Sequence, residues 1–105
     1  MNKGKCDYLG SLISVSQILN VDFKKYTSIE LQLRYKNPDK YGFFTTQKFS
    51  VDTIKNLVDN DYYRIFISNV DIAAWLPFGL GYISLGGVNT NNDIEFTLVA
   101  IYGIK

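Results

Sequence analysis

The sequence predicts an all-β protein, an antiparallel, jelly-roll-like β-sandwich with one short helical turn. Aromatic residues make up 15% of the chain, eight Tyr, seven Phe and one Trp, and such residues are enriched in strands. Hydrophobic and polar residues alternate with a period of two over several segments. Strands do not alternate with long helical patterns, as they would in a parallel sheet.

The size of the chain fits one domain. Its 105 residues, 47% of them hydrophobic, are enough for one packed core. No linker or repeat divides the sequence, so we expect a single domain over residues 1–105, with residues 1–7 as a polar leader. Cys6, the one cysteine, lies in this leader, which excludes an internal disulfide and a paired-cysteine metal site.

The N-terminal half predicts a strand followed by a hairpin. The apolar, serine-spaced segment Leu9–Asn20 is the first expected strand. In Ser28–Lys36 apolar residues alternate without fault with charged or amide residues, which indicates a sheet packed on one side and solvated on the other. Asn37–Lys40 has the Asn, Pro and Asp of a turn. Because Tyr41–Phe49 alternates again, we expect an antiparallel hairpin.

A helical turn is expected next. In Ser50–Asn60 the apolar residues recur at spacings of three and four, which is the stripe of one helical face. Either Ser50 or Asp52 is placed to cap its N-terminus. An irregular crossover between strands is the alternative interpretation.

The C-terminal half predicts three more strands. Asp61–Val70 alternates, and Leu76–Val88 is interpreted as one strand bent or bulged at its glycines. Asn89–Asp93 has the composition of a turn. Ile94–Ile104 is expected to close the fold as a long strand, and its second half is apolar on both faces, which predicts burial on both sides.

Charge and hydropathy exclude two classes of partner. The net charge is +1, from 11 basic and 10 acidic residues, and the basic residues are scattered, so we do not expect nucleic-acid binding. The longest apolar stretch, Ile72–Ile83, has 12 residues interrupted by Pro and Gly. It is too short to span a membrane, and no secretory signal is present, so we expect no membrane insertion.

Catalytic chemistry is poorly represented. The chain has no histidine, which removes histidine-activated nucleophiles, histidine-bound zinc and the commonest general base. No spacing favours a catalytic carboxylate pair among Asp61, Asp71, Asp93 and Glu95. The Asn/Asp clusters at 59–61 and 89–93 offer oxygen ligands for calcium, but turn formation is the preferred interpretation. We therefore expect a protein that is not an enzyme and has no cofactor or metal.

Four aromatic or basic residues are candidates for ligand binding. Trp75, beside a Pro-Phe corner, is interpreted either as a plug in the core or a subunit interface, or as a platform for a sugar ring. Tyr62 is expected on the opposite face from Tyr63, beside Arg64, and Tyr41 at a turn. In an oligomer the surplus aromatic residues would instead cover the subunit contact.

Two segments resemble small virion proteins of tailed phages. Leu19–Tyr35 contains an Asn-Val-Asp-x-x-x-Tyr turn leading into a strand, and the chain ends in Tyr102-Gly-Ile-Lys105. This pattern is similar to tail-fibre and receptor-binding head domains and to capsid decoration or head-fibre proteins. The resemblance implies a compact β-sandwich, commonly trimeric, that contacts host-surface saccharide or neighbouring virion proteins. Fibre heads usually follow a stalk, so a start at Met1 is expected for an excised head or a small decoration subunit.

The leading hypothesis is a non-enzymatic phage structural protein located in the virion. We expect a homo-oligomer, with a trimer favoured, that serves host-surface recognition or virion decoration. The apolar second half of the last strand motivates the oligomer, because it exceeds what one face of a monomer of this size needs. The alternatives are a free-standing carbohydrate-binding module and a small inhibitor protein.

Overall fold

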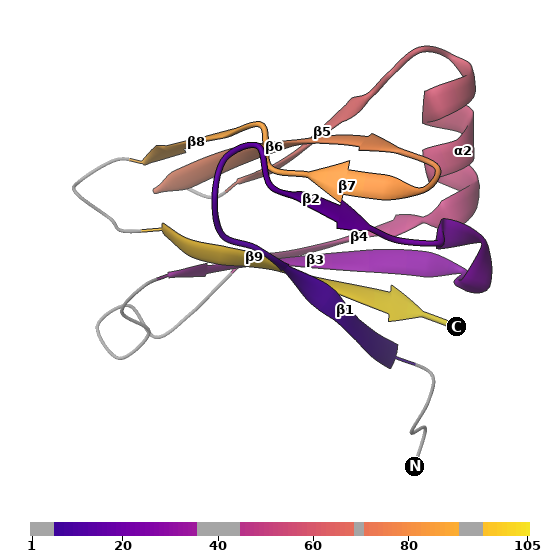
Figure 1. The fold of residues 1–105 in the computed structure, drawn as a ribbon, viewed down its shortest axis with the longest axis horizontal. Helices are drawn as coiled ribbons and strands as arrows, with labels where there is room; N and C mark the ends of the chain where they lie inside the picture. Colours follow the sequence, from indigo (N-terminus) through magenta and orange to yellow (C-terminus); the bar gives the residue numbers. More distant parts are fainter. Residues whose placement is uncertain (1–5, 36–44, 69–70, 91–95) are drawn as a thin grey trace.

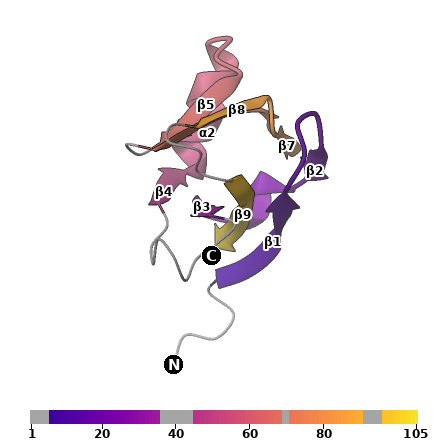
Figure 2. The same cartoon turned by 90° about the vertical axis from the view of Figure 1, so that its left-hand side faces the viewer.

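The computed structural model describes residues 6–35, 45–68, 71–90 and 96–105. Two antiparallel sheets form two layers, and a helix stands at one end of them (Figure 1). Figure 2 shows the two layers from the side. The predicted class, an antiparallel β-sandwich with one short helical element, is confirmed.

The first sheet has the strand order β1-β9-β3-β4 in the described part of the chain. Its strands are β1 (Cys6–Leu12), β9 (Phe96–Ile104), β3 (Ser28–Tyr35) and β4 (Thr45–Ser50). β1 and β9 pair from Cys6 opposite Ile104 to Leu12 opposite Val99, with an irregularity between Tyr8 and Gly10. The first and last described strands of the chain are therefore neighbours.

The second sheet has the order β2-β7-β6-β5, and β8 also pairs with β6. Its strands are β2 (Ile18–Asn20), β7 (Tyr82–Ser84), β6 (Ile72–Gly79), β5 (Arg64–Ser68) and β8 (Gly87–Thr90). β5 pairs with one edge of β6. On the other edge, β8 pairs with residues 72–75 of β6 and β7 with residues 78–79. β6 is thus the central strand of this sheet.

Within the described residues, two helical elements join the sheets. The 3₁₀ turn η1 (Phe23–Lys25) lies between β2 and β3, and α2 (Val51–Asp59) leads from β4 to β5. The predicted helical turn is confirmed, with Ser50 as its cap: Ser50 Oγ accepts a hydrogen bond from the Thr53 backbone N–H at 3.0 Å. Asp52 lies in the first turn, where its negative charge favours the helix N-terminus.

The core lies between the two sheets. The predicted alternation is confirmed in β3, where Ile29, Leu31 and Leu33 are buried, and in β5, where Ile65 and Ile67 are buried between exposed neighbours. The remaining buried apolar residues of the same cluster are Leu12, Val21, Phe23, Val51, Ile54, Ile72, Ala74, Leu76, Phe78, Ile83, Leu85, Val99 and Ile101.

The first predicted strand is wrong in its extent. Instead of one strand over Leu9–Asn20, the chain turns a corner after Leu12 and enters the second sheet at Ile18. Ser16 adopts a positive φ of 73° there, and the Gln17 side chain accepts a hydrogen bond from the Ile13 N–H at 2.8 Å. β1 also begins at Cys6, so Cys6 and Asp7 belong to a strand and not to the expected leader.

The glycine-broken strand predicted over Leu76–Val88 is instead a hairpin with an interrupted second arm. β6 turns at Leu80 and Gly81, and Phe78 pairs with Ile83. Pro77 has no N–H, and its carbonyl accepts a hydrogen bond from Ser84 Oγ at 3.3 Å. On this side of β6, Pro77 lies between the residues paired with β8 and those paired with β7. No neighbouring strand needs a backbone N–H from it there, so the central strand can hold a proline.

Other boundaries shift as well. The sequence predicts a strand from Asp61, but β5 starts at Arg64. The Tyr62 N–H donates a hydrogen bond to the Leu57 carbonyl at 2.8 Å and so still belongs to the end of the helix. Asn89 and Thr90, expected in a turn, belong to β8. The predicted turn Asn37–Lys40, the start of the second hairpin strand and the remainder of the Asn89–Asp93 turn lie outside the described residues.

The last strand is buried on both faces at Val99, Ala100 and Ile101, as predicted. The cover over Ala100 comes from the same chain, however. On the outer face Ala100 is paired with Gln32, and a hydrogen bond of 2.9 Å from Arg34 Nη2 to the Tyr102 hydroxyl crosses this row. The burial of Val99, Ala100 and Ile101 is therefore achieved within one chain, and it does not by itself argue for a partner.

Candidate functional site

Two of the predicted site residues meet on the outer face of the second sheet. In the β5–β6 ladder Trp75 is paired with Phe66, and Arg64 with Pro77. Paired residues point to the same side of a sheet. Because Leu76 and the isoleucines of β5 point into the core, Arg64, Phe66, Trp75 and Pro77 share the outer surface.

The other two predicted residues do not join this group. Tyr62 is 63% exposed and precedes β5 beside the end of α2, where its backbone closes the helix. Tyr41 lies outside the described residues. The predicted set is therefore brought together only in part.

The indole of Trp75 lies against its own sheet. A Cβ atom built at Gly86 would come within 2.7 Å of Trp75 Cδ1, and one built at Gly87 within 2.5 Å of Cε2. The ring thus covers Gly86 and Gly87, at the junction of β7 and β8, and is partly exposed. Of the interpretations made from the sequence, a plug in the monomer core is wrong, and a surface for a partner or ligand remains.

Further apolar side chains continue this surface. Tyr82 of β7 covers Gly79, since a Cβ there would come within 2.5 Å of its Cε1. Phe66 is 60% exposed, Ile18 of β2 62% and Tyr82 38%. We call the surface formed by Phe66, Trp75, Pro77, Tyr82 and Ile18 the aromatic face.

Charge is nearly absent from the aromatic face. Among the residues of β2, β5, β6, β7 and β8, Arg64 is the single charged one. At the edge of the sheet, the loop that carries exposed Ile13 and Val15 is fixed to the β7–β8 junction by a hydrogen bond of 2.7 Å from the Ser16 N–H to the Leu85 carbonyl. Two more exposed apolar residues therefore lie in a loop that is attached to this sheet.

The sequence alone does not single out Phe66. The alternation of β5 places Phe66 with Arg64 and Ser68 on the solvent side, and an exposed ring on one strand is unremarkable by itself. The available signal was a large aromatic residue on the polar side of a clean strand. Its importance follows only from its pairing with Trp75, which requires the register of two strands.

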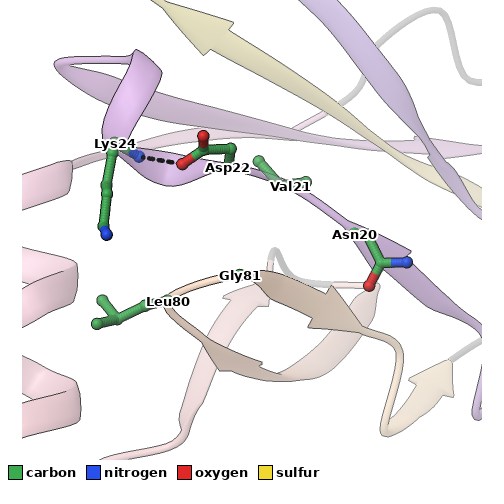
Figure 3. A pocket seen from close by; sticks show the side chains of 6 residues that line it. All are labelled: Asn20, Val21, Asp22, Lys24, Leu80 and Gly81. Atoms are coloured by element: carbon green, nitrogen blue, oxygen red, sulfur yellow. Dashed lines mark hydrogen bonds between the residues drawn. The ribbon is translucent and has the colours of Figure 1, made fainter.

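A cavity of about 450 Å³ lies elsewhere, between the segment that leads into η1 and the β6–β7 turn. Figure 3 shows its lining residues, Asn20, Val21, Asp22, Lys24, Leu80 and Gly81. The Asp22 carboxylate accepts a hydrogen bond from the Lys24 N–H at 3.2 Å, and the Val21 N–H donates to the Gly81 carbonyl at 3.0 Å. The Asp22 carboxylate therefore serves the 3₁₀ turn, and the backbone of Val21 attaches this segment to the hairpin.

The described residues contain no cluster of three or more His, Cys, Asp or Glu side chains able to hold a metal ion. Asn60 and Asp61, weighed as calcium ligands, act in the turn after α2: Asn60 Nδ2 donates to the Asn56 carbonyl at 2.8 Å, and Asp61 accepts from the Tyr63 hydroxyl at 2.7 Å. This hydrogen bond raises the pKa of Tyr63. None of the helices in the described ranges has the length and hydropathy of a membrane span.

Comparison with protein-family models, with curated proteins and with solved structures gives no match to this chain.

Proposed function

We propose that the protein is a non-enzymatic structural protein that assembles with copies of itself through the aromatic face. The observation that carries this proposal is the continuity of exposed Phe66, Tyr82 and Ile18 with Trp75 and Pro77 across one sheet. Contiguous apolar surface of this kind marks interaction sites. Because the strands beneath it carry one charge, the face is chemically suited to a copy of itself, as in the apolar interfaces of homodimers and other homo-oligomers.

The wider context of the proposal is a tailed-phage virion, where the subunit would serve decoration or host-surface recognition, with a trimer favoured. It is supported by the resemblance of Leu19–Tyr35 and of the C-terminal residues to such proteins. These two segments also touch. The Tyr26 ring covers Gly103, where a Cβ would come within 2.6 Å of Cδ1, and the Thr27 N–H donates to the Ile104 carbonyl at 2.7 Å.

The test is sedimentation of the purified chain over a micromolar concentration range. We expect the wild type to be oligomeric and Phe66→Asp to be monomeric, because burying a carboxylate in an apolar contact costs free energy. Tyr8→Asp is the matched control. Tyr8 is also aromatic and 60% exposed, but it lies on the first sheet, so this variant should keep the oligomer.

Two outcomes would refute the proposal. One is a wild-type chain that is monomeric throughout the concentration range. The other is an oligomer that survives Phe66→Asp but is lost in Tyr8→Asp, which would move the contact to the first sheet. Circular dichroism of each variant establishes that the fold is retained, as expected for substitutions at exposed positions.

A further inference from the structure

The outer face of the first sheet carries side chains in rows that run across its strands. The pairing places Tyr8, Tyr102, Glu30 and Lys48 in one row, which takes one residue from each strand. The strands are roughly 4.8 Å apart, so a row extends about 14 Å. This face points away from the second sheet, and therefore away from the aromatic face (Figure 2).

Polar side chains on this face hold one another in place. Gln32 Nε2 donates to Glu30 Oε2 at 3.1 Å, and Arg34 Nη2 donates to Gln32 Oε1 at 2.8 Å and to the Tyr102 hydroxyl at 2.9 Å. All of these residues are partly buried. Because the chain of hydrogen bonds fixes their positions before any ligand arrives, little side-chain entropy is lost on binding.

An exposed ring with a fixed orientation lies next to this chain of polar groups. The ring of Tyr8 packs against that of Tyr102, with centroids 5.4 Å apart and planes tilted by 56°. The Tyr8 hydroxyl is hydrogen-bonded to Ser11 Oγ. The ring is thus held both by packing and by its hydroxyl, although 60% of the residue is exposed.

We propose that this face, formed by Tyr8, Glu30, Gln32, Arg34 and Tyr102, is a saccharide-binding platform. A sugar ring has an apolar C–H side and a rim of hydroxyls. The exposed surface of Tyr8 takes the C–H side, while the Glu30 carboxylate accepts hydrogen bonds from hydroxyls and the Gln32 amide exchanges them. Arg34 is a positioning residue, since its hydrogen bonds hold Gln32 and Tyr102. An aromatic surface with a few well-placed polar groups is the usual composition of such a site.

The contrast between the two outer faces supports this assignment. The aromatic face has several rings but a single charged side chain, Arg64, so sugar hydroxyls buried there would find fewer strong hydrogen-bond partners in exchange for water. The first sheet supplies those groups next to a ring. Its charges, Arg34 and Lys48 against Glu30, nearly balance, which does not suit the phosphates of a nucleic acid. The platform does not depend on self-assembly through the opposite face.

The test begins with the purified full-length chain on a microarray of neutral and uronic-acid-containing oligosaccharides. The strongest binder is then titrated by calorimetry, which gives the affinity of each chain for the sugar. A variant that only dissociates the oligomer, and so loses multivalent binding to the array, is thereby distinguished from one that loses the binding site. We expect Tyr8→Ala to weaken binding about tenfold or more, since the stacking surface is removed. Tyr8→Phe keeps the ring and should stay within a few-fold of the wild type.

Phe66→Ser is the matched control, because it removes an equally exposed ring from the opposite face. It should retain the affinity per chain even where it abolishes the oligomer, which separates this proposal from the proposed function. Glu30→Gln should weaken binding through the loss of a charged acceptor. The platform is refuted if no oligosaccharide binds, if Tyr8→Ala binds as the wild type does, or if Phe66→Ser alone loses binding.

Discussion

The indole of Trp75 occupies the space above Gly87 in which any other residue would carry its Cβ atom. A Cβ there would lie 2.5 Å from both Cε2 and Cη2, and one at Gly86 would lie 2.7 Å from Cδ1. The pair of glycines at the β7–β8 junction therefore determines where the ring of Trp75 rests. The shape of the aromatic face depends on residues that contribute no side chain to it.

Replacing Gly87 should displace this ring. Gly87→Ala is expected to lower the free energy of unfolding by about 1–3 kcal/mol, as overpacked substitutions do. The fluorescence maximum should shift too, because Trp75 is the single tryptophan. Gly81→Ala is the control: a Cβ there meets no atom within 4 Å, so stability should stay equal or rise by up to about 1 kcal/mol. Equal behaviour of the two variants in urea unfolding would contradict the close contact.

The helix cap at Ser50 should contribute measurably to stability. Ser50→Ala removes the side-chain acceptor for the Thr53 N–H and is expected to cost about 1 kcal/mol. Ser50→Asp keeps an acceptor and adds a charge that favours the helix N-terminus, so it should restore most of the loss. Urea unfolding of the three proteins tests this, and an Asp variant as unstable as the Ala variant would show that the cap is not the cause.

Apart from the long last strand β9, the elements that the sequence predicted correctly are those with two distinct faces. β3, β5 and α2 each bury one side and expose the other, so their periods of two or of three and four can be seen in a short segment. β2 and β7 have three residues each, too few to show a period. β7 also forms a local hairpin with β6, but β2 depends on its pairing with β7, where Ile18 lies opposite Ser84, 66 residues later in the chain. No local pattern reveals that pairing.

The sites were less predictable for the same reason. Trp75 and Arg64 could be chosen individually, but their common surface arises from the pairing of Phe66 with Trp75 in the β5–β6 ladder. The contact between Tyr8 and Tyr102 joins the first and last described strands. Alternation within one strand gives the side on which a residue lies, whereas its neighbours across the sheet follow from strand order and register.

Adjacent residues in β5 should differ sharply in their contribution to stability. Ile67 is fully buried and Ser68 exposed, so Ile67→Ala should lower the free energy of unfolding by about 2–5 kcal/mol, through lost burial and a residual cavity. Ser68→Ala should change it by less than about 0.5 kcal/mol. Urea unfolding at low protein concentration measures both, and a one-residue error in the register of β5 would reverse the order.

The stability of the protein should fall at alkaline pH in a way that depends on Tyr26. Its hydroxyl donates a hydrogen bond to Asp7 Oδ2 at 3.2 Å. Desolvation, followed by the hydrogen bond and negative charge of Asp7, raises the pKa of Tyr26 in the folded protein. The neutral phenol is thus favoured by folding. Its contribution is complete below the unfolded value of about 10 and is lost as the pH rises through the raised folded pKa.

Tyr26→Phe should therefore reduce stability at neutral pH by about 1 kcal/mol, the value of one hydrogen bond, and also flatten the alkaline decline. Tyr62→Phe is the control for the loss of a tyrosine hydroxyl, since Tyr62 is 63% exposed and is not part of the contact with Asp7. Urea midpoints measured from pH 7 to above about 10 distinguish the two variants.

Some decline should persist in Tyr26→Phe, because the hydrogen bond to Asp61 raises the pKa of Tyr63 in the same direction. An undiminished slope in Tyr26→Phe would show that the contact with Asp7 is not coupled to folding.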